Sequence, residues 1–494
     1  MKYVLNGDMA RKVDEYTIEQ MGLPSMVLME RAALSVATKA AQMAAGFKRS
    51  VRICAVCGCG KNGADGIAAA RILIWQGLMV DIMIVGDTSS ACEEFTRQVE
   101  IVANSGINFS NIQNIPEYDI VIDAIFGTGL NREVSGQYAD VIRLINNSSN
   151  LVISVDIPSG TDAATGRILG ISVAADITVT FGYNKQGLML YPGKEYAGEV
   201  TVADIGFCPE AIRELNPAMY FTMEDLKGIP KRIDSAHKGT YMRTLVIAGS
   251  KDMSGAAMLS SAAAYRTGAG LLEVFTHSDN VGVIRSLLPE AIVRDYSAVS
   301  ERLDKADIII IGPGLSTDET AVELCFKVFS ESTVPIIADA DALNIIAVNP
   351  GLLEGHSAPV IITPHIGEMA RLTGAKRSDI ASDPIKAASD FADRYNVICA
   401  LKDAVTVVCE PSGMGGRKYI NNSGCAAMAK AGMGDVLCGV IAGMLSLRIE
   451  PFSAACAGVY IHGLAGEAAC ENISSHSVLA GDLLKEFGRV MECR

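Results

Sequence analysis

The segment Ala431-Gly432-Met433-Gly434-Asp435-Val436-Leu437-Cys438-Gly439 combines two closely spaced glycines, an acidic residue and the start of an apolar run. The run over residues 436–444 predicts a helix, whose N-terminus would carry unpaired N–H groups and attract anions. Because glycines leave backbone amides accessible, the segment predicts a phosphate site. A structural alternative stays open on this segment alone: a tight turn in which Asp435 caps the helix.

Asp435 does not neutralise a phosphate, because both groups are negative. Its more useful role is to take a proton from a hydroxyl that attacks the phosphate. We therefore predict Asp435 as a catalytic base.

Apolar runs of strand length alternate with helical patterns on both sides of this segment. Continuous apolar strands separated by helices predict α/β architecture with parallel sheets covered on both faces. The expected strands cover residues 52–57, 80–85, 120–125, 151–155, 177–181, 244–248, 271–276, 308–311, 334–338, 360–362, 397–401 and 406–409. The expected helices include residues 9–45, 66–76 and 254–267.

Composition limits the class of protein. The chain has 494 residues, 49% of them hydrophobic and 20% charged, which is typical of globular proteins with more than one domain. A net charge of −14 argues against a broad nucleic-acid or membrane surface. We therefore expect a soluble cytoplasmic protein that binds small molecules, with no nucleic-acid or membrane partner. Small-residue helices and the apolar balance also favour a homo-oligomer.

The 13 cysteines are odd in number and spread through apparent core segments, which suits a reducing compartment. Cys54, Cys57 and Cys59 form the one visible cluster, without a second group at metal-ligand spacing. They alternate with apolar residues, so we interpret them as a buried strand that runs into a loop.

The strand–helix pattern stops and starts afresh near residues 215–235. Pro209, Pro217 and Pro230 interrupt it, and charged residues gather around Lys231. The sequence shows no close internal repeat. We therefore predict two different α/β domains, at residues 1–215 and 225–494.

Three loops of the first half combine glycine with oxygen-bearing side chains, and each follows an apolar strand. Ligands of open parallel sheets bind beyond the carboxyl ends of the strands, so these loops are expected to lie together. Asn62, Asp123 and Ser159 would supply oxygen ligands to a hard cation. The backbone amides of residues 127–129 would hold a phosphate.

These segments resemble the N-terminal domain of the YjeF family of NAD(P)H-hydrate repair proteins, which are epimerases. The matching residues are Lys61-Asn62-Gly63-Ala64-Asp65-Gly66, Asp123-Ala124-Ile125-Phe126-Gly127-Thr128-Gly129, Ser154-Val155-Asp156-Ile157-Pro158-Ser159-Gly160, Leu28-Met29-Glu30-Arg31-Ala32 and Thr178-Val179-Thr180-Phe181-Gly182. The resemblance implies a Rossmann-like fold, and K⁺ bound by Asn62, Asp123 and Ser159. It also implies a substrate site formed by Lys61, Asn62, Gly63, Ala64, Asp65, Gly127, Thr128, Gly129, Leu130, Asn131, Arg132, Glu133 and Asp156.

Asp156 is the carboxylate that we expect to move protons in the epimerisation. A structural alternative is an Asp that stabilises the turn at Ile157. Two residues depart from the family pattern: Lys61 stands where Asn is usual, and Ala64 replaces a glycine. Lys61 would either repel a cation or pair with a substrate phosphate.

The second half resembles the ribokinase-like, ADP-dependent dehydratases of the same family. The matching segments, in order, are His237-Lys238-Gly239-Thr240-Tyr241, Gly255-Ala256-Ala257, Arg266-Thr267-Gly268-Ala269-Gly270-Leu271, Gly312-Pro313-Gly314-Leu315, Asp339-Ala340-Asp341-Ala342-Leu343-Asn344, Thr363-Pro364-His365-Ile366-Gly367-Glu368 and the opening segment. The expected fold class is thus two three-layer αβα domains, N-terminal Rossmann-like and C-terminal ribokinase-like.

This resemblance implies which residues bind the two dehydratase substrates. The hydrate would contact Ala256, Gly314, His365 and Asp435. The nucleotide would contact Lys402, Asp403, Ala404, Val405, Thr406 and Gly434, although Asp403 replaces a family glycine. His365 has a structural role as its alternative. Asp339 and Asp341 either bind Mg²⁺ through water or form a buried network at a strand end.

The favoured hypothesis is a bifunctional enzyme that epimerises NAD(P)H-hydrate and dehydrates the S form with ADP, with K⁺ and Mg²⁺ as cofactors. NADH-hydrate, NADPH-hydrate and ADP would be its ligands. Phosphorylation would turn the hydroxyl into a better leaving group. Two alternatives remain at this stage: a ribokinase-type small-molecule kinase, and an N-terminal domain that only binds.

Overall fold

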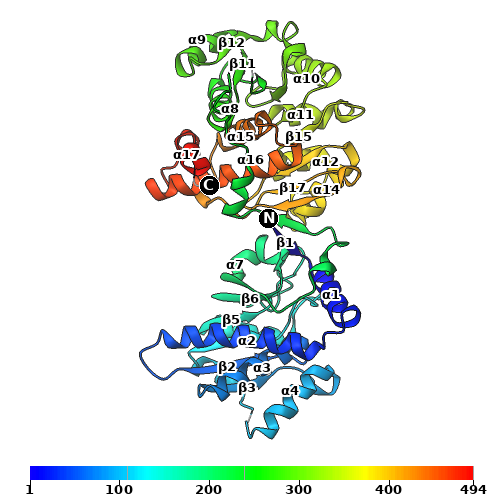
Figure 1. The fold of residues 1–494 in the computed structure, drawn as a ribbon, viewed down its shortest axis with the longest axis vertical. Coiled ribbons are helices and arrows are strands. Elements are labelled where there is room, and N and C mark those ends of the chain that lie inside the picture. Colours follow the sequence, from blue (N-terminus) through cyan, green and yellow to red (C-terminus); the bar gives the residue numbers. More distant parts are fainter. Residues whose placement is uncertain (108, 149, 238–239, 493–494) are drawn as a thin grey trace. The chain divides into compact units, whose positions relative to one another are not determined.

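The computed structural model describes residues 1–107, 109–148, 150–237 and 240–492. Lys238 and Gly239, part of one motif above, lie outside the described residues. The chain forms two compact units, one of residues 3–218 and one of residues 219–494 with Met1 and Lys2 (Figure 1). Each unit is an α/β structure and is described by itself.

The N-terminal unit contains a six-stranded parallel sheet of order β3-β2-β4-β5-β6-β8. Every residue of β4 and β6 is buried, as is typical of parallel strands that are covered on both faces. The strands are β2 (Arg52–Cys57), β3 (Met79–Ile84), β4 (Ile120–Ala124), β5 (Leu151–Val155), β6 (Ile177–Phe181) and β8 (Glu199–Ala203). A short parallel pair joins β1 (Lys2–Leu5) to β7 (Asn184–Lys185).

Helices cover both faces of this sheet and make three layers. One core contains side chains of α2, α3 and α4, and the core on the opposite face contains those of α5. The helices are α1 (Gly7–Glu15), α2 (Ser25–Ala45), α3 (Lys61–Trp75), α4 (Glu93–Asn104), α5 (Gly136–Asn146), α6 (Gln186–Met189) and α7 (Gly193–Ala197).

Two helix predictions in this unit were wrong in their bounds. The helix expected over residues 9–45 is broken, because Gly22 adopts a positive φ of 73° and Pro24 precedes the start of α2. The helix expected from residue 66 begins five residues earlier, at Lys61, with Gly60 as its N-cap. The Gly/Asn-rich stretch is thus the first turn of α3, where backbone N–H groups need no intrahelical partner.

The C-terminal unit has seven parallel strands in the order β12-β11-β10-β13-β14-β15-β16, followed by the antiparallel β17 and β18 and by β9. These are β9 (Ala218–Tyr220), β10 (Arg243–Ile247), β11 (Leu271–Thr276), β12 (Ile292–Asp295), β13 (Ile308–Ile311), β14 (Ile336–Ala338), β15 (Val360–Ile362), β16 (Ile398–Leu401), β17 (Val407–Cys409) and β18 (Lys418–Ile420).

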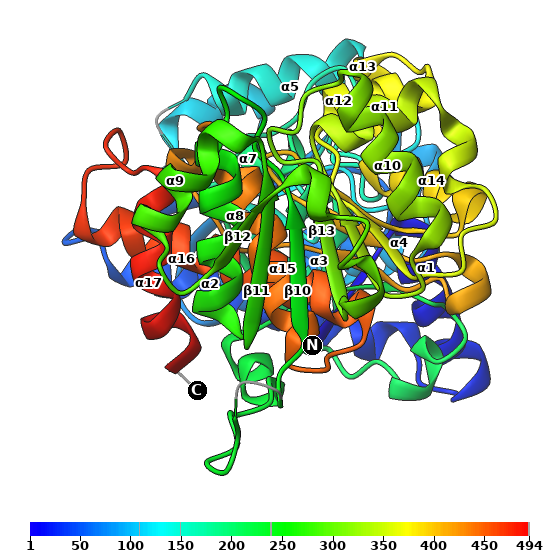
Figure 2. The same cartoon turned by 90° about the horizontal axis from the view of Figure 1, so that it is seen from above.

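Figure 2 shows two groups of helices on either side of this sheet. Side chains of α8, α9, α15, α16 and α17 share one core with the strands, and α10 to α14 lie on the other side. The helices are α8 (Ser254–Thr267), α9 (Ser278–Leu287), α10 (Glu319–Glu331), α11 (Asp341–Val348), α12 (Ile366–Thr373), α13 (Arg377–Ser382), α14 (Pro384–Tyr395), α15 (Met433–Ser446), α16 (Pro451–Asn472) and α17 (Ala480–Glu492).

The segment that opened the sequence analysis lies at the start of α15. Gly432 is the N-cap residue with a φ of 89°, and no side chain caps this helix. Asp435 is the third helical residue, so the alternative of an N-capping Asp435 is wrong. The helix begins at Met433, ahead of the expected residue 436, because Gly432 supplies the left-handed conformation that starts it.

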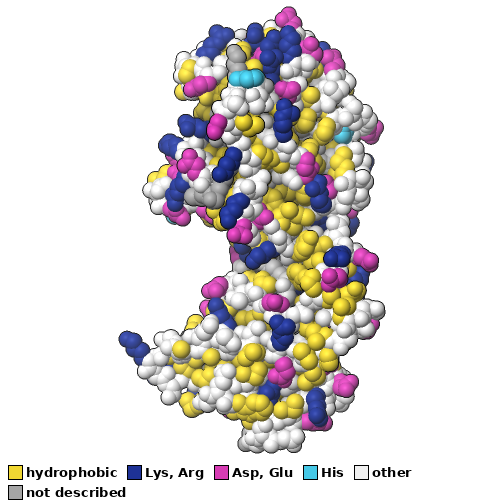
Figure 3. All heavy atoms as spheres, in the orientation of Figure 1, with side chains coloured by type: hydrophobic (Ala, Val, Ile, Leu, Met, Phe, Trp, Pro, Cys, Tyr) yellow, Lys and Arg dark blue, Asp and Glu magenta, His cyan; other side chains and the backbone are white. Residues whose placement is uncertain are grey.

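Charged side chains of both signs occur together on the surface drawn in Figure 3, interspersed among apolar ones. Within the described ranges, the helices are too short or too polar to cross a membrane.

Glycines on α15 allow this helix to pack closely against α8. A Cβ on Gly439 would clash with the carbonyl oxygen of Ser260 and lie 2.6 Å from the Cβ of Ala263. In contrast, a Cβ on the exposed Gly488 of α17 would meet no atom within 4 Å.

We expect Gly439→Ala to lower the free energy of unfolding by about 1–3 kcal/mol, because the added methyl forces α8 and α15 apart. Gly488→Ala is the matched control and should be neutral or stabilising, since Ala favours helix. Denaturant unfolding of the full chain measures both. Equal stability of the two variants would contradict the close crossing.

Candidate active sites

The carboxyl edge of the N-terminal sheet opens into a cavity of about 1020 Å³. Parallel strands end at the same edge, so the loops after β2, β4 and β5 meet there. Of the residues predicted to bind the epimerase substrate, ten line the cavity: Lys61, Asn62, Asp65, Gly127, Thr128, Gly129, Leu130, Asn131, Arg132 and Asp156.

Three of the predicted substrate residues do not line the cavity. Gly63 packs so closely on Gly58 that an added Cβ would clash with the Gly58 carbonyl oxygen. Ala64 is buried in the core beneath α3. Glu133 is exposed outside the cavity.

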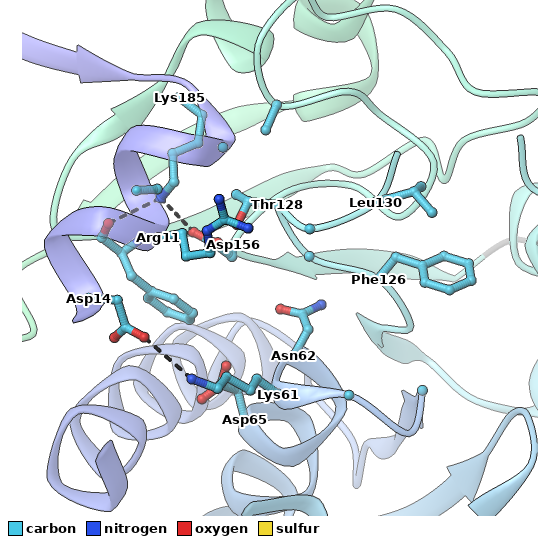
Figure 4. Close-up of a pocket in the computed structure, with 18 of the residues that line it drawn as sticks. Arg11, Asp14, Lys61, Asn62, Asp65, Phe126, Thr128, Leu130, Asp156 and Lys185 are labelled. Atoms are coloured by element: carbon cyan, nitrogen blue, oxygen red, sulfur yellow. Dashed lines mark hydrogen bonds and ion pairs between the residues drawn. The ribbon is translucent and has the colours of Figure 1, made fainter. Parts of the chain in front are cut away.

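Asp156 is the best-anchored carboxylate of the cavity. It follows β5 in a left-handed conformation, with a φ of 66° that non-glycine residues rarely adopt. Its Oδ1 accepts hydrogen bonds from Lys185 Nζ at 2.7 Å and from Thr180 Oγ1 at 3.0 Å. The structure therefore fixes this side chain at the strand edge (Figure 4).

Lys185 is a cavity residue that the sequence analysis missed. Its side chain is 2% exposed, and its ammonium also donates to Thr180 Oγ1 at 2.8 Å and to the carbonyl oxygens of Phe181 and Tyr183 at 3.1 Å. A buried ammonium needs such partners, because desolvation disfavours its charge. A lysine four residues after the buried strand β6 was the available signal.

Asp65 projects from α3 toward the same part of the cavity (Figure 4). Burial raises its pKa well above the usual range, and the negative charges of Asp156 and Asp14 raise it further. The cavity thus brings a carboxyl with a raised pKa close to an aspartate held by a lysine. Such a pair is suited to giving and taking protons.

Lys61, which departs from the family pattern, lies between two carboxylates. Its Nζ is 3.5 Å from Asp14 Oδ2 and 3.8 Å from Glu94 Oε1. Burial would lower the pKa of Lys61, but the two carboxylates outweigh it and raise the pKa. Its charge is therefore largely compensated in this structure.

The three predicted cation ligands lie near one another. Asp123 is buried, and its Oδ1 accepts a hydrogen bond from Ser159 Oγ at 2.5 Å. Burial raises the pKa of Asp123, while the hydrogen bonds from Ser159 oppose that shift. Asn62 lies beside Gly127 and has a buried amide nitrogen without a hydrogen-bond partner. Because the two ends of an amide are exchangeable in assignment, an oxygen there would fit a hard cation.

The C-terminal unit brings its polar residues together around one ion pair. Lys402 Nζ, after β16, lies 2.7 Å from Asp339 Oδ1, after β14. Asp339 Oδ2 also accepts a hydrogen bond from Cys438 Sγ at 3.3 Å. Gly434 covers the pair: a Cβ there would be 3.1 Å from Lys402 Nζ and 3.2 Å from Asp339 Oδ2.

Asp435 adjoins this ion pair in the first turn of α15. Burial raises its pKa to about 6, with further increases from the charges of Asp339 and Asp341 and a decrease from Lys402. A carboxyl with a pKa near 6 ionises at neutral pH yet still accepts protons readily. This places a suitable base at the N-terminus of a helix, where phosphate is favoured.

His365 and Glu368 form a capping box at the start of α12. His365 Nδ1 accepts a hydrogen bond from the Gly367 amide at 2.8 Å, and Glu368 Oε2 accepts one from the His365 amide at 2.7 Å. Burial, with a contribution from Lys402, lowers the pKa of His365. His365 therefore has a structural role as the helix cap. Its imidazole is half exposed, so it also remains accessible to a ligand.

Glu368 is a second residue to which the sequence analysis assigned no role. Burial raises its pKa to about 7, although the charge of Lys402 opposes that shift. Glu368 therefore interacts electrostatically with Lys402 and Asp339, the ion pair that also acts on Asp435. The signal for it was its place in the Thr363–Glu368 motif, at the end of a buried strand.

Ala256 and Gly314, predicted to contact the hydrate, lie next to each other. A Cβ on Gly314 would be 2.9 Å from the Cβ of Ala256. Gly314 has a φ of 56°, so a larger residue there would be both strained and crowded.

The residues of the predicted nucleotide segment differ in their exposure. Asp403 and Ala404 are exposed, whereas Val405 is buried and Thr406, just before β17, is half-buried. Lys402 points to Asp339. Asp341, in contrast, accepts a hydrogen bond on Oδ2 from the Ser316 amide at 2.8 Å.

The cysteine cluster of the first half lies within β2 and the loop after it. Cys54 and Cys57 are buried, and burial raises their thiol pKa values. Across the described part of the chain, no group of three His, Cys, Asp or Glu residues is arranged to hold a metal ion.

Comparisons with known proteins match both halves. A family model described as NAD(P)H-hydrate dehydratase matches residues 244–489, and one described as YjeF-related protein N-terminus matches residues 25–187. A bifunctional NAD(P)H-hydrate repair enzyme of Moorella thermoacetica is 35% identical over 98% of this chain and 95% of its own. The enzyme of the same description from Escherichia coli is 34% identical over 88% and 84%, respectively.

Solved structures resemble the C-terminal half. An ADP/ATP-dependent NAD(P)H-hydrate dehydratase of Bacillus subtilis, co-crystallised with ATP and Mg²⁺, has a TM-score of 0.50 and 33% identity, covering 55% of this chain and 97% of its own. A ribokinase-like superfamily protein of Enterococcus faecalis has a TM-score of 0.51 and 26% identity, covering 56% and 95%.

We expect Lys185→Met to lower the free energy of unfolding by about 3–5 kcal/mol, because it leaves the partly buried Asp156 carboxylate without its cation. The double variant Lys185→Met/Asp156→Asn removes that charge as well and should recover part of the loss. Denaturant unfolding of the wild type, both single variants and the double variant gives the coupling energy. If the losses of stability in the two single variants add up exactly in the double variant, Lys185 and Asp156 do not stabilise the protein as a pair.

Proposed function

This chain belongs to the bifunctional NAD(P)H-hydrate repair enzymes, and we propose how its residues divide the two reactions. Residues 1–215 form the epimerase domain, which interconverts the R and S hydrates. Residues 225–494 form the dehydratase domain, which returns the S hydrate to NAD(P)H and converts ADP to AMP and phosphate. The substrates are NADH-hydrate and NADPH-hydrate.

Asp435 acts as the base of the dehydratase. It takes the proton from the C6 hydroxyl as that oxygen bonds to the β-phosphorus of ADP, and AMP leaves. The amides at the start of α15 and the Lys402 ammonium stabilise the charge on the transferring phosphoryl group. The observation that carries this role is the place of Asp435 in the first turn of α15, beside the glycine that covers Lys402, where burial raises its pKa to about 6.

The phosphorylated hydrate then eliminates phosphate. The C6–O bond breaks with its electron pair on the phosphate, and a proton leaves C5, so the C5–C6 double bond of the dihydronicotinamide forms. Ala256 and Gly314 leave room for the ring, and His365 contacts the hydrate from the start of α12.

The acidic residues of this site fit Mg²⁺ bound with the nucleotide. Asp339 and Asp341 raise the pKa of Asp435 through their negative charge, and a divalent cation would relieve that repulsion. Because Lys402 and Cys438 already engage Asp339, Asp339 and Asp341 would hold Mg²⁺ through water. Mg²⁺ would supply charge neutralisation at the phosphates. Lys402 to Thr406 and Gly434 would border the nucleotide.

Asp156 and Asp65 carry out the epimerisation. Asp156 takes the proton of the C6 hydroxyl, the C6–N1 bond breaks to leave an aldehyde, and Asp65 gives its proton to N1. Rotation about the C5–C6 bond and the reverse steps close the ring on the other face. The observation that carries this assignment is the Lys185-bound Asp156 in the same cavity as Asp65, whose pKa is raised by burial.

Asn62, Asp123 and Ser159 would hold K⁺ at this site. The unpartnered amide atom of Asn62 and the two oxygen-bearing neighbours fit a hard cation. K⁺ would stabilise the loop after β4, and Lys61 would not repel it strongly, because Asp14 and Glu94 compensate the Lys61 charge.

We propose a homo-oligomer in a reducing, cytoplasmic compartment. Exposed apolar side chains such as Leu34, Trp75 and Met79 on the N-terminal unit support association. The described cysteines are all free thiols, which supports a reducing environment.

Asp435→Asn and Asp156→Asn should separate the two activities. We expect Asp435→Asn to reduce dehydration at least about a hundredfold and to leave epimerisation unchanged, because it removes only the dehydratase base. Asp156→Asn should do the converse. The measurement follows dihydronicotinamide absorbance from mixed hydrates with ADP, alongside epimer exchange without ADP.

Each variant serves as the control for the other, because both substitutions keep the size of the side chain and remove one negative charge. With Asp156→Asn, recovery should stop at the fraction present as the S hydrate, once spontaneous epimerisation is subtracted. Dehydration that survives in Asp435→Asn would remove Asp435 from the mechanism.

The dehydratase should depend on pH through Asp435. Because its carboxyl must be ionised to accept a proton and its pKa is about 6, kcat/KM for dehydration should fall about tenfold per unit below pH 6. The profile is measured from pH 4.5 to 8, with spontaneous reactions subtracted. A flat profile over that range would show that Asp435 does not act as the base.

A further inference from the structure

An aromatic pair lines the epimerase cavity away from its carboxylates. Phe126 follows β4 and Tyr138 belongs to α5, with ring centroids 4.9 Å apart and planes inclined by 49°. Both rings are partly exposed to the cavity, and Leu130 lies beside them in the same core. The proton transfers proposed above use none of these three side chains.

Tyr138 lies over the opposite part of the sheet from Asp156, whereas Phe126 follows β4, the neighbour of β5. Tyr138 packs on Gly86, just beyond the end of β3, where an added Cβ would clash with the hydroxyl. In the sheet order β3-β2-β4-β5, Asp156 follows β5, three strands away. With strands about 4.8 Å apart, this amounts to roughly 14 Å. Figure 4 shows Phe126 and Leu130 across the cavity from Lys185.

The middle of the cavity is suited to a pyrophosphate. The strand order reverses between β2 and β4, which is the point at which open α/β sheets bind dinucleotides. The N-terminus of α3 at Lys61 and the Gly127–Gly129 loop meet in this cavity. Added Cβ atoms on Gly60 and Gly129 would meet nothing within 4 Å, so their backbone is open to a ligand.

We propose that Phe126, Tyr138 and Leu130 form the subsite for the adenine ring of the dinucleotide hydrate. The pyrophosphate lies over the switch point, and the hydrated ring reaches Asp156. This inference rests on the proposed function for the position of the hydrated ring. An adenine ring has a π-face that stacks on aromatic side chains, whereas the hydrated nicotinamide ring has lost part of its conjugation.

The experiment compares two substrates in the full-length protein. Phe126→Leu and Tyr138→Leu keep apolar bulk but remove the aromatic faces. We expect each to raise KM for NADH-hydrate about tenfold, from the loss of stacking. The hydrate of reduced nicotinamide mononucleotide has no adenine, so its KM and kcat should not change. Epimer exchange, measured by NMR without ADP, reports the epimerase alone.

Competition identifies the base at the subsite. 5′-AMP should inhibit epimer exchange of NADH-hydrate competitively, and its inhibition constant should rise about tenfold in Phe126→Leu. Phe326→Leu makes the same change at an exposed phenylalanine outside the cavity; it is the matched control and should leave both substrates unaffected. Thermal unfolding of each variant shows whether it folds.

Equal losses with the dinucleotide and the mononucleotide, in folded variants, would overturn the adenine subsite. So would an absence of inhibition by 5′-AMP. Failure of the proposed function gives a different result, since Asp156→Asn would then still exchange the epimers. Loss of exchange in Asp156→Asn with unchanged KM in Phe126→Leu would overturn only the subsite.

Discussion

Each unit contains a buried lysine–aspartate ion pair at the carboxyl edge of its sheet, and this pairing of buried charge is the constraint on which both sites depend. Lys185 meets Asp156 and Lys402 meets Asp339, each at 2.7 Å. A buried charge is costly unless it is paired and hydrogen-bonded. The surrounding strands therefore have to end where these partners meet, and the strand ends in turn position the loops.

Both ion pairs also depend on an unusual backbone conformation nearby. Two non-glycine residues with positive φ lie at these ion pairs: Asp156, the first residue after β5, belongs to one pair, and Ala340, two residues after β14, follows Asp339 of the other. Gly434 lies over Lys402 and Asp339, where a side chain would touch both charged groups. Backbone strain of this kind persists where the surrounding structure holds it in place, as at functional sites. The strain and the ion pairs thus occur at the same strand ends.

Much of the fold follows from local pattern. Apolar runs such as residues 52–57 and 308–311 form the expected strands, because strands that are buried on both faces of a parallel sheet need apolar residues at every position. The break at Gly22 and Pro24 was missed because the apolar spacing continues through it. The partner of Asp156 was also missed, since Lys185 lies 29 residues away and no spacing rule joins them. Long-range pairings depend on the sheet order, which the sequence does not state.

The two sites use the same ion pair in different ways. In the N-terminal unit, the carboxylate that we propose to react is itself the partner of the lysine, so Asp156 is fixed, and burial with the charge of Asp156 raises the pKa of Asp65. In the C-terminal unit, Lys402 is paired with Asp339 rather than with the proposed base. Burial and the nearby charge of Asp339 raise the pKa of Asp435 to about 6. In the proposed mechanism, the first arrangement supplies an acid–base pair for a reversible proton exchange. The second supplies a single base for a one-way phosphoryl transfer.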